Sequence, residues 1–200
     1  ISENASTVGS FDLGLYKTKD GSNEVLKDLE NHMFEIVYLL GVDNLKFEKK
    51  NEFIIYQGSH GDKGAEIADI ILPGAAYTEQ NGYFTNLEGK LQKAYKASYP
   101  PNEAKEDWLI INELAEAMNH RKLFNDKDEL DSSLLNQINL FIEKDKSIKA
   151  SSVKDLKFNK EILKVENEDY YYSNVIARAS KTMFECKTAK INLKLTGTED

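Results

Sequence analysis

The chain has 200 residues, of which 40% are hydrophobic, and it carries a net charge of -8 with a pI near 5.1. This length predicts one domain with a self-sufficient core, with or without an appended tail. The negative charge argues against nucleic acid and anionic membrane surfaces as partners, because both bind clustered Lys and Arg side chains. Such an acidic surface is ordinary for a soluble intracellular protein.

Metal and disulfide chemistry have little support in the sequence. The single cysteine, Cys186, excludes an internal disulfide and an iron–sulfur cluster held by this chain alone. The histidines, His32, His60 and His120, stand in no metal-ligand spacing, so a zinc site is not expected. No run reaches the roughly 20 apolar residues of a membrane span, and no direct membrane insertion is predicted. The chain opens on Ile1 without a signal-peptide pattern, and because it lacks an initiator Met we expect a fragment or a processed product of a longer polypeptide.

The first 60 residues predict one helix and two strands. Residues 1–20 contain glycines that interrupt any periodicity, and we expect them to be irregular. Ser22 is a candidate N-cap for a helix over 23–31. Short apolar runs at 33–40 and 53–56 are typical of strands that are covered on both faces.

A third short apolar run at 69–72 ends at Pro73-Gly74. Three such strands with helical or Gly-rich connections predict an α/β fold with a mainly parallel sheet flanked by helices. The connections before the second and third strands are short for full crossovers, which leaves the strand order open. Beyond Pro73 we expect an irregular stretch with alternating pieces at 83–85 and 91–97.

The following stretch predicts two helices. Asn102 is a candidate N-cap for the first, and Trp108 on its apolar stripe is expected to be a core anchor. Asp126 and Glu129 stand at capping-box spacing before the second. The apolar stripe of the first helix is at 104, 108, 111, 115 and 118, and that of the second is Leu130, Leu134, Ile138 and Phe141.

The C-terminal part predicts a linker and a last helix. Residues 144–164, rich in Lys and Ser, favour a linker or an extended wrapping segment. Ser173 or Asn174 is a candidate cap for the helix. The three consecutive tyrosines at 170–172 are either a partner-binding patch or locally packed rings. The predicted domains are an α/β domain over 1–122 and a helical extension and tail over 123–200, packed on the same domain.

The loop "GSHGDKG" at 58–64 is the candidate functional site. It follows a strand, and backbone N–H groups at such a junction can hold an anion. Its glycines are spaced G-x-x-G-x-x-G, which is neither a dinucleotide fingerprint nor a phosphate loop. Glycines that supply positive-φ turns are the alternative. His60 and Asp62 form either an acid–base pair or a turn-stabilising Asp beside an exposed His, and Ser59 indicates a nucleophile only faintly.

The segment "ADIILPGAAYTEQNGYFTNLEGKLQ" resembles the signature of the molybdopterin oxidoreductase family. The matching positions are Ala68, Asp69, Leu72, Pro73, Glu79, Gly82, Asn86, Glu88, Gly89 and Gln92. The flanking "FIIYQGSHGDKG", the later "PPNEAKEDWLIINELAE" and the tail "ARASKTM" are similar to the family of the large iron–sulfur subunit of NADH:quinone oxidoreductase, respiratory complex I.

The resemblance implies a structural domain in an enzyme that passes electrons from NADH toward quinone and translocates protons. Catalytic residues, a bound cofactor and a metal are not expected in this chain. Gly58, His60, Gly61 and Asp62 would be vestigial cofactor-loop residues that now keep shape or face a neighbour. Iron–sulfur clusters would lie in an N-terminal region that this chain lacks.

The implied partners are that N-terminal iron–sulfur region and the other subunits of the peripheral arm, which hold the flavin, NADH and quinone sites. The implied location is the cytoplasmic face of a bacterial inner membrane or the matrix side of a mitochondrion. Two alternatives stay open: a fragment of a molybdopterin-dependent oxidoreductase that still binds its cofactor, and a nucleotide- or anion-binding module.

Overall fold

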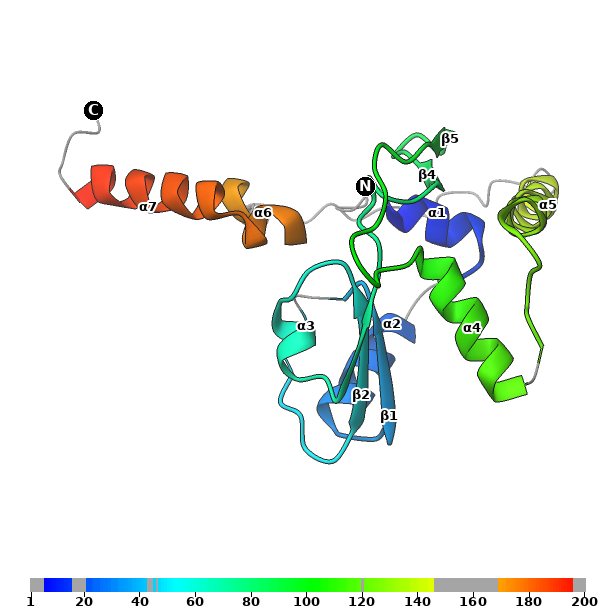
Figure 1. Ribbon diagram of the computed structural model, residues 1–200, viewed down its shortest axis with the longest axis horizontal. Helices are drawn as coiled ribbons and strands as arrows, with labels where there is room; N and C mark the ends of the chain where they lie inside the picture. The colour runs from blue at the N-terminus through cyan, green and yellow to red at the C-terminus, as the bar shows by residue number, and fades with distance from the viewer. Residues whose placement is uncertain are drawn as a thin grey trace, which may run out of the picture.

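The computed structural model describes residues 6–15, 21–42, 45, 47–119, 121–145 and 169–195. Figure 1 shows a small sheet with helices on either side, a hairpin above it, and a C-terminal helix that extends away from the rest. The helices are α1 (Ser6–Asp12), α2 (Gly21–Glu30), α3 (Lys63–Glu66), α4 (Asp107–Asn119), α5 (Lys127–Asp145), η1 (Tyr170–Tyr172), α6 (Val175–Ala179) and α7 (Lys181–Leu195). The strands are β1 (Ile36–Leu40), β2 (Phe53–Gly58), β3 (Ile70–Pro73), β4 (Gly82–Thr85) and β5 (Leu91–Ala94).

The first three strands form a parallel sheet in the order β1-β2-β3. The predicted α/β class with a parallel sheet and a helical C-terminal part is therefore confirmed. The strand order that the sequence left open is sequential, with β2 in the centre. β1 begins at Ile36 rather than at residue 33, so Met33 and Phe34 precede the sheet.

The core lies on one face of this sheet. Leu39, Ile54 and Tyr56 are buried there and contact side chains on and around α3. Their partly buried neighbours are Val37, Leu45, Phe47, Ala65, Ile67 and Ala68. Burying each such large side chain stabilises the fold by about 2 kcal/mol, so this face anchors the loop between β2 and β3.

The hairpin β4–β5 is antiparallel and contacts α1. The prediction that residues 1–20 are irregular is wrong for 6–12, which form α1. The sequence of α1 does not by itself predict a helix. Packing against β4 stabilises it, because short helices depend on tertiary contacts for their stability. Ser22 lies inside α2 rather than at its cap, since that helix begins at Gly21.

The prediction that Asn102 caps the next helix is wrong, because α4 begins at Asp107. Lys105 is in extended pairing instead: its N–H donates to the Pro73 carbonyl (3.1 Å), and its carbonyl accepts from Ala75 N–H (2.8 Å). These bonds to the end of β3 keep the backbone out of helical geometry until Asp107.

Trp108 is half-buried rather than a fully buried anchor, and its indole N–H donates to Glu106 (3.1 Å). At the start of α5, the Asp126 carboxylate accepts from Glu129 N–H (2.9 Å), as predicted. In a capping box the Glu129 carboxylate would accept from the N–H of Asp126. Here it accepts from the N–H of the preceding residue, Asn125 (2.8 Å).

The predicted last helix is two helices, α6 and α7, separated by Ser180 in an extended conformation (ψ 121°). Asn174, not Ser173, is the N-cap: its side chain accepts from Ala177 N–H (2.9 Å). The predicted linker at 144–164 lies almost wholly outside the described residues.

Candidate functional site

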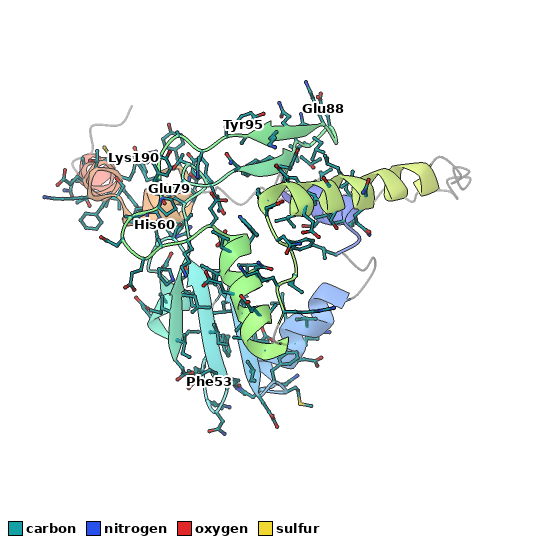
Figure 2. The ribbon with its side chains drawn as sticks, turned by 45° about the vertical axis from the view of Figure 1, so that its right-hand side comes forward. Phe53, His60, Glu79, Glu88, Tyr95 and Lys190 are labelled. Carbon is teal, nitrogen blue, oxygen red and sulfur yellow. The ribbon has the colours of Figure 1, made fainter. Side chains whose placement is uncertain are left out.

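A pocket of about 630 Å³ opens at the carboxyl ends of β2 and β3. In open α/β sheets this is the edge where ligands bind. The loop after β2 contributes Ser59 and His60, the loop after β3 contributes Glu79, and Asn102 and Glu103 close the far side. Figure 2 labels His60 and Glu79, which both lie above the sheet.

Packing explains two of the three glycines of the loop, and positive-φ turn geometry explains none of them. None of Gly58, Gly61 and Gly64 has a positive φ, so the positive-φ alternative is wrong for all three. A Cβ at Gly64 would stand 2.5 Å from the carbonyl oxygen of Val42, and one at Gly58 would strike the buried ring of Tyr56. Around Gly61 there is open space.

Tyr56 fixes the loop from below. It is 2% exposed, and its hydroxyl donates to the His60 carbonyl (2.8 Å). The His60 ring turns to its neighbour, with Nδ1 2.9 Å from Ser59 Oγ. The loop therefore follows the shape of an aromatic ring beneath it.

Asp62 ends the loop and joins it to the C-terminal helices. Its carboxylate caps α3 by accepting from Lys63 N–H (2.8 Å) and pairs with Arg178 Nε of α6 (2.6 Å). Burial alone would raise the pKa of the Asp62 carboxyl, but the hydrogen bonds from Arg178 and Lys63 outweigh it and lower that pKa. The carboxylate is thus bound to α3 and α6, and of the two alternatives for His60 and Asp62 the acid–base pair is not formed.

A buried polar network beneath the pocket was missed by sequence reasoning. Gln57 is fully buried, and its Nε2 donates to Asp107 Oδ1 (2.8 Å). Gln80 Nε2 donates to the other carboxylate oxygen (2.9 Å), and Asp107 N–H donates back to Gln80 Oε1 (3.2 Å). The only sequence signal was an amide residue at the end of an otherwise apolar strand.

Tyr38 completes this network from β1 by donating its hydroxyl to Gln57 Oε1. Burial, and secondly the negative charge of Asp107, raise the pKa of Tyr38. The network connects two strands, the loop after β3 and the start of α4, so it fixes the base of the pocket.

Two acidic residues of the family-like segment hold backbone groups of this chain. Asp69 Oδ2 accepts from Ile54 N–H (2.8 Å), and Oδ1 pairs with Lys49 (2.6 Å). Glu79 Oε2 accepts from Ala76 N–H (2.9 Å). The first bond fixes β2 against the start of β3, and the second closes the turn that follows β3.

The same segment builds the β4–β5 hairpin turn. Asn86 Oδ1 accepts from the N–H groups of Glu88 (3.0 Å) and Lys90 (2.9 Å). Gly89 has a φ of 81°, a conformation that favours glycine. These signature positions are therefore explained by backbone geometry.

The pocket lining does not match a phosphate-bearing cofactor. Glu79 and Glu103 supply negative charge, and the described lining residues include no Lys or Arg. The single-turn helix α3 already has Asp62 at its N-terminus. Nor do the described residues bring three or more His, Cys, Asp or Glu side chains together in a way that could hold a metal ion.

The three tyrosines are partly packed on their own helices. Tyr170 and Tyr171 meet edge to face at 5.5 Å, and Lys187 of α7 lies 4.0 Å from the ring centroid of Tyr172. Tyr170 remains 80% exposed. Local packing thus accounts for two of the rings.

Within the described ranges, no helix is long and apolar enough to cross a bilayer.

Two family models match this chain. The model for molybdopterin oxidoreductase matches residues 1–117, and the model for the C-terminal part of the NADH-ubiquinone oxidoreductase G subunit matches residues 138–186. The first covers more than half of the 200 residues.

Individual relatives agree with the models. The NADH-quinone oxidoreductase G subunit of Rickettsia bellii is 43% identical over 203 residues, covering 98% of this chain and 28% of the relative. The NADH-ubiquinone oxidoreductase 75 kDa subunit of Reclinomonas americana is 38% identical over 193 residues, covering 92% and 27%. The mitochondrial 78 kDa subunit of Candida albicans is 35% identical over 198 residues, covering 91% and 26%. The chain thus spans about a quarter of the length of these curated relatives.

Proposed function

We infer the function from one premise: this chain belongs to the molybdopterin oxidoreductase family and, within it, to the large G subunit of NADH:quinone oxidoreductase. We propose that it is a structural domain of that subunit which carries no redox centre of its own. The electron path from NADH toward quinone would run through clusters and cofactors held elsewhere.

One observation carries this proposal. The groups of the glycine loop at 58–64 are occupied within this chain: the Asp62 carboxylate is bound to α3 and to Arg178, and Gly58 and Gly64 fit against the Tyr56 ring. An acidic pocket lining adds to it, since phosphate groups favour cationic surroundings. Gly58, His60, Gly61 and Asp62 are therefore proposed as shape-keeping residues with no catalytic role.

The remaining features of the proposal follow from the relatives. Iron–sulfur clusters would lie in other parts of the subunit, and the partners would be that region and further subunits of the complex. Bacterial and mitochondrial relatives suggest the cytoplasmic face of the inner membrane or the matrix side. We propose a boundary near residue 122 between the α/β domain and a helical extension, supported by the two model matches.

The first experiment tests for a redox centre. The purified chain is expected to show no visible absorbance and no stoichiometric iron or molybdenum by elemental analysis. Stoichiometric metal would overturn the proposal, and a pterin released on denaturation and identified by mass spectrometry would favour the cofactor-binding alternative. If calorimetric titration with nucleotides gives a heat of binding, and the Gly61→Ala variant gives none, the result would favour the alternative of a nucleotide-binding module.

The second experiment tests the structural role in the whole complex. Arg178→Met removes the ion pair to Asp62 and is expected to lower the amount of assembled complex, while NADH:quinone turnover per assembled complex stays unchanged. Ser59→Ala, which removes an exposed hydroxyl and its contact with the His60 ring but leaves the Asp62–Arg178 pair intact, is the control in the same loop. A loss of turnover in fully assembled Arg178→Met complex would contradict a purely structural role.

A further inference from the structure

The pocket at the carboxyl ends of β2 and β3 carries two carboxylates that form no ion pair with the described residues. Glu79 and Glu103 both line it, and its described lining includes no Lys or Arg. One oxygen of Glu79 accepts from Ala76 N–H (2.9 Å). Glu103 is exposed and, within the described part of the chain, has neither a hydrogen bond nor an ion pair. We call this the acidic pocket.

Three basic residues from the surrounding segments already pair with other acids. These pairs are Arg178 with Asp62 (2.6 Å), Lys96 with Glu106 (3.2 Å) and Lys105 with Glu113 (2.7 Å). A cleft lined by charge of one sign concentrates its electric field and attracts the opposite charge. The acidic pocket is therefore suited to a cationic group from outside the described residues.

The loop after β3 also lines a second pocket, of about 400 Å³, against the C-terminal helices. Tyr77, which follows Ala76 of the acidic pocket, lines it together with Tyr170 of η1, Ile176 of α6 and Met183 of α7. The two tyrosines are 62% and 80% exposed, and none of the described lining residues is charged. We call this the tyrosine pocket. Figure 2 shows Glu79 on the side of the molecule where the C-terminal helices lie.

The loop that joins the two pockets is held in place by the rest of the chain. The Thr78 carbonyl accepts from the N–H groups of Ala97 (2.8 Å) and Ser98 (3.2 Å). Gln80 Nε2 donates to Asp107 Oδ2 (2.9 Å) at the start of α4. A surface that is ordered before binding loses less conformational entropy when a partner docks. The two pockets therefore form a preorganised surface.

The chemistry of this surface favours a protein segment over a small cation. The guanidinium group of Arg pairs with carboxylates through two parallel hydrogen bonds and also stacks on aromatic rings. Tyr, Met and Arg are enriched where proteins meet, and the residues that contribute most to binding gather in pockets. A small cation would fill the acidic pocket and leave the tyrosine pocket empty. A segment with an Arg beside an apolar side chain fills both.

We propose that the acidic and tyrosine pockets together bind an arginine-bearing segment of another subunit. Its guanidinium group pairs with Glu79 and Glu103, and an apolar neighbour packs between Tyr77 and Tyr170. This rests on the proposed function, because that function places the chain in a complex of several subunits. It adds the docking surface and the chemistry of the partner.

A photo-crosslinker in place of Tyr77 identifies the occupant, in the full-length subunit alone and in the assembled complex. In the complex, we expect crosslinked peptides from another subunit, with an Arg close to the crosslinked position. In the isolated subunit, we expect none from outside the chain. Peptides from the same polypeptide alone, peptides without Arg, or an assembled complex without any crosslink to another subunit would each overturn the proposal.

Glu103→Gln tests the role of charge, and Glu116→Gln, an exposed position on α4 outside the pocket lining, is the matched control with the same change in net charge. The crosslink yield at Tyr77 is expected to fall at least about tenfold in Glu103→Gln, because removing one charge of a desolvated pair weakens binding strongly. It is expected to stay unchanged in Glu116→Gln. Equal yields in the two variants would refute the pairing with Arg.

The small-cation alternative is tested by calorimetric titration of the full-length subunit with spermidine. Heat of binding that is lost in Glu103→Gln, together with a complex that gives no crosslink to another subunit, would assign the pocket to a small cation and overturn the proposal. These readouts are independent of metal content. Stoichiometric metal in the purified chain would refute the proposed function without changing the crosslinks at Tyr77.

Discussion

The substitution Gly64→Ala tests the explanation of the glycine loop most directly. The added Cβ would lie 2.5 Å from the backbone oxygen of Val42 and 2.9 Å from the ring of Tyr56. Neither can yield easily, since one is backbone and the other is a buried ring. Overpacking of this kind costs about 1–3 kcal/mol, against a gain of at most about 1 kcal/mol from removing glycine from a helix. We expect Gly64→Ala to destabilise the chain by about 1–2 kcal/mol.

Gly61→Ala is the matched control in the same loop. Its Cβ meets nothing within 4 Å and its φ is not positive, so the expected change lies between zero and a stabilisation of about 1 kcal/mol. Urea unfolding of the purified variants measures both, with m-values unchanged if the denatured state is the same. The packing argument is refuted if Gly61→Ala is the more destabilising of the two.

Three further changes test the contacts around the site. Gln57→Leu leaves the partly buried Asp107 carboxylate without one donor and is expected to cost about 2 kcal/mol in urea unfolding; a loss below about 0.5 kcal/mol would contradict a stabilising network around the buried Gln57. Arg178→Met breaks a partly exposed ion pair, so the free energy of unfolding should fall by less than about 1 kcal/mol. Limited proteolysis should nevertheless remove α6 and α7 faster than in the unmodified chain. An unchanged rate of cleavage would show that the ion pair does not hold these helices in place. Hydrogen bonds from the N–H of Lys50 and of Glu52 itself lower the pKa of Glu52 from 4.5 to about 2, so its contribution is present above pH 4.5 and is lost as the pH falls toward 2. Glu52→Gln should flatten the acid side of the stability profile, and an unaltered profile would contradict this assignment.

Several elements could be predicted because their signals are local. Short apolar runs bounded by turn residues predicted the strands of the parallel sheet, and side-chain caps such as Asn174 have a fixed offset to the N–H they bind. The site residues were predicted only by position: the sequence placed the glycine loop after a strand but offered only anion binding or positive-φ turns as its explanation. Packing against Tyr56, which depends on tertiary structure, explains Gly58 and Gly64 instead.

The sequence by itself determined the α/β class, the helical C-terminal part and the family, because hydrophobic period and signature spacing are written along the chain. Tertiary structure alone decided that α4 starts at Asp107, since the competing pairing of Lys105 with Pro73 joins residues far apart in sequence. It also decided that Asp62 meets Arg178 across 116 positions. Contacts of that separation form only once the chain has folded, and no local pattern encodes them.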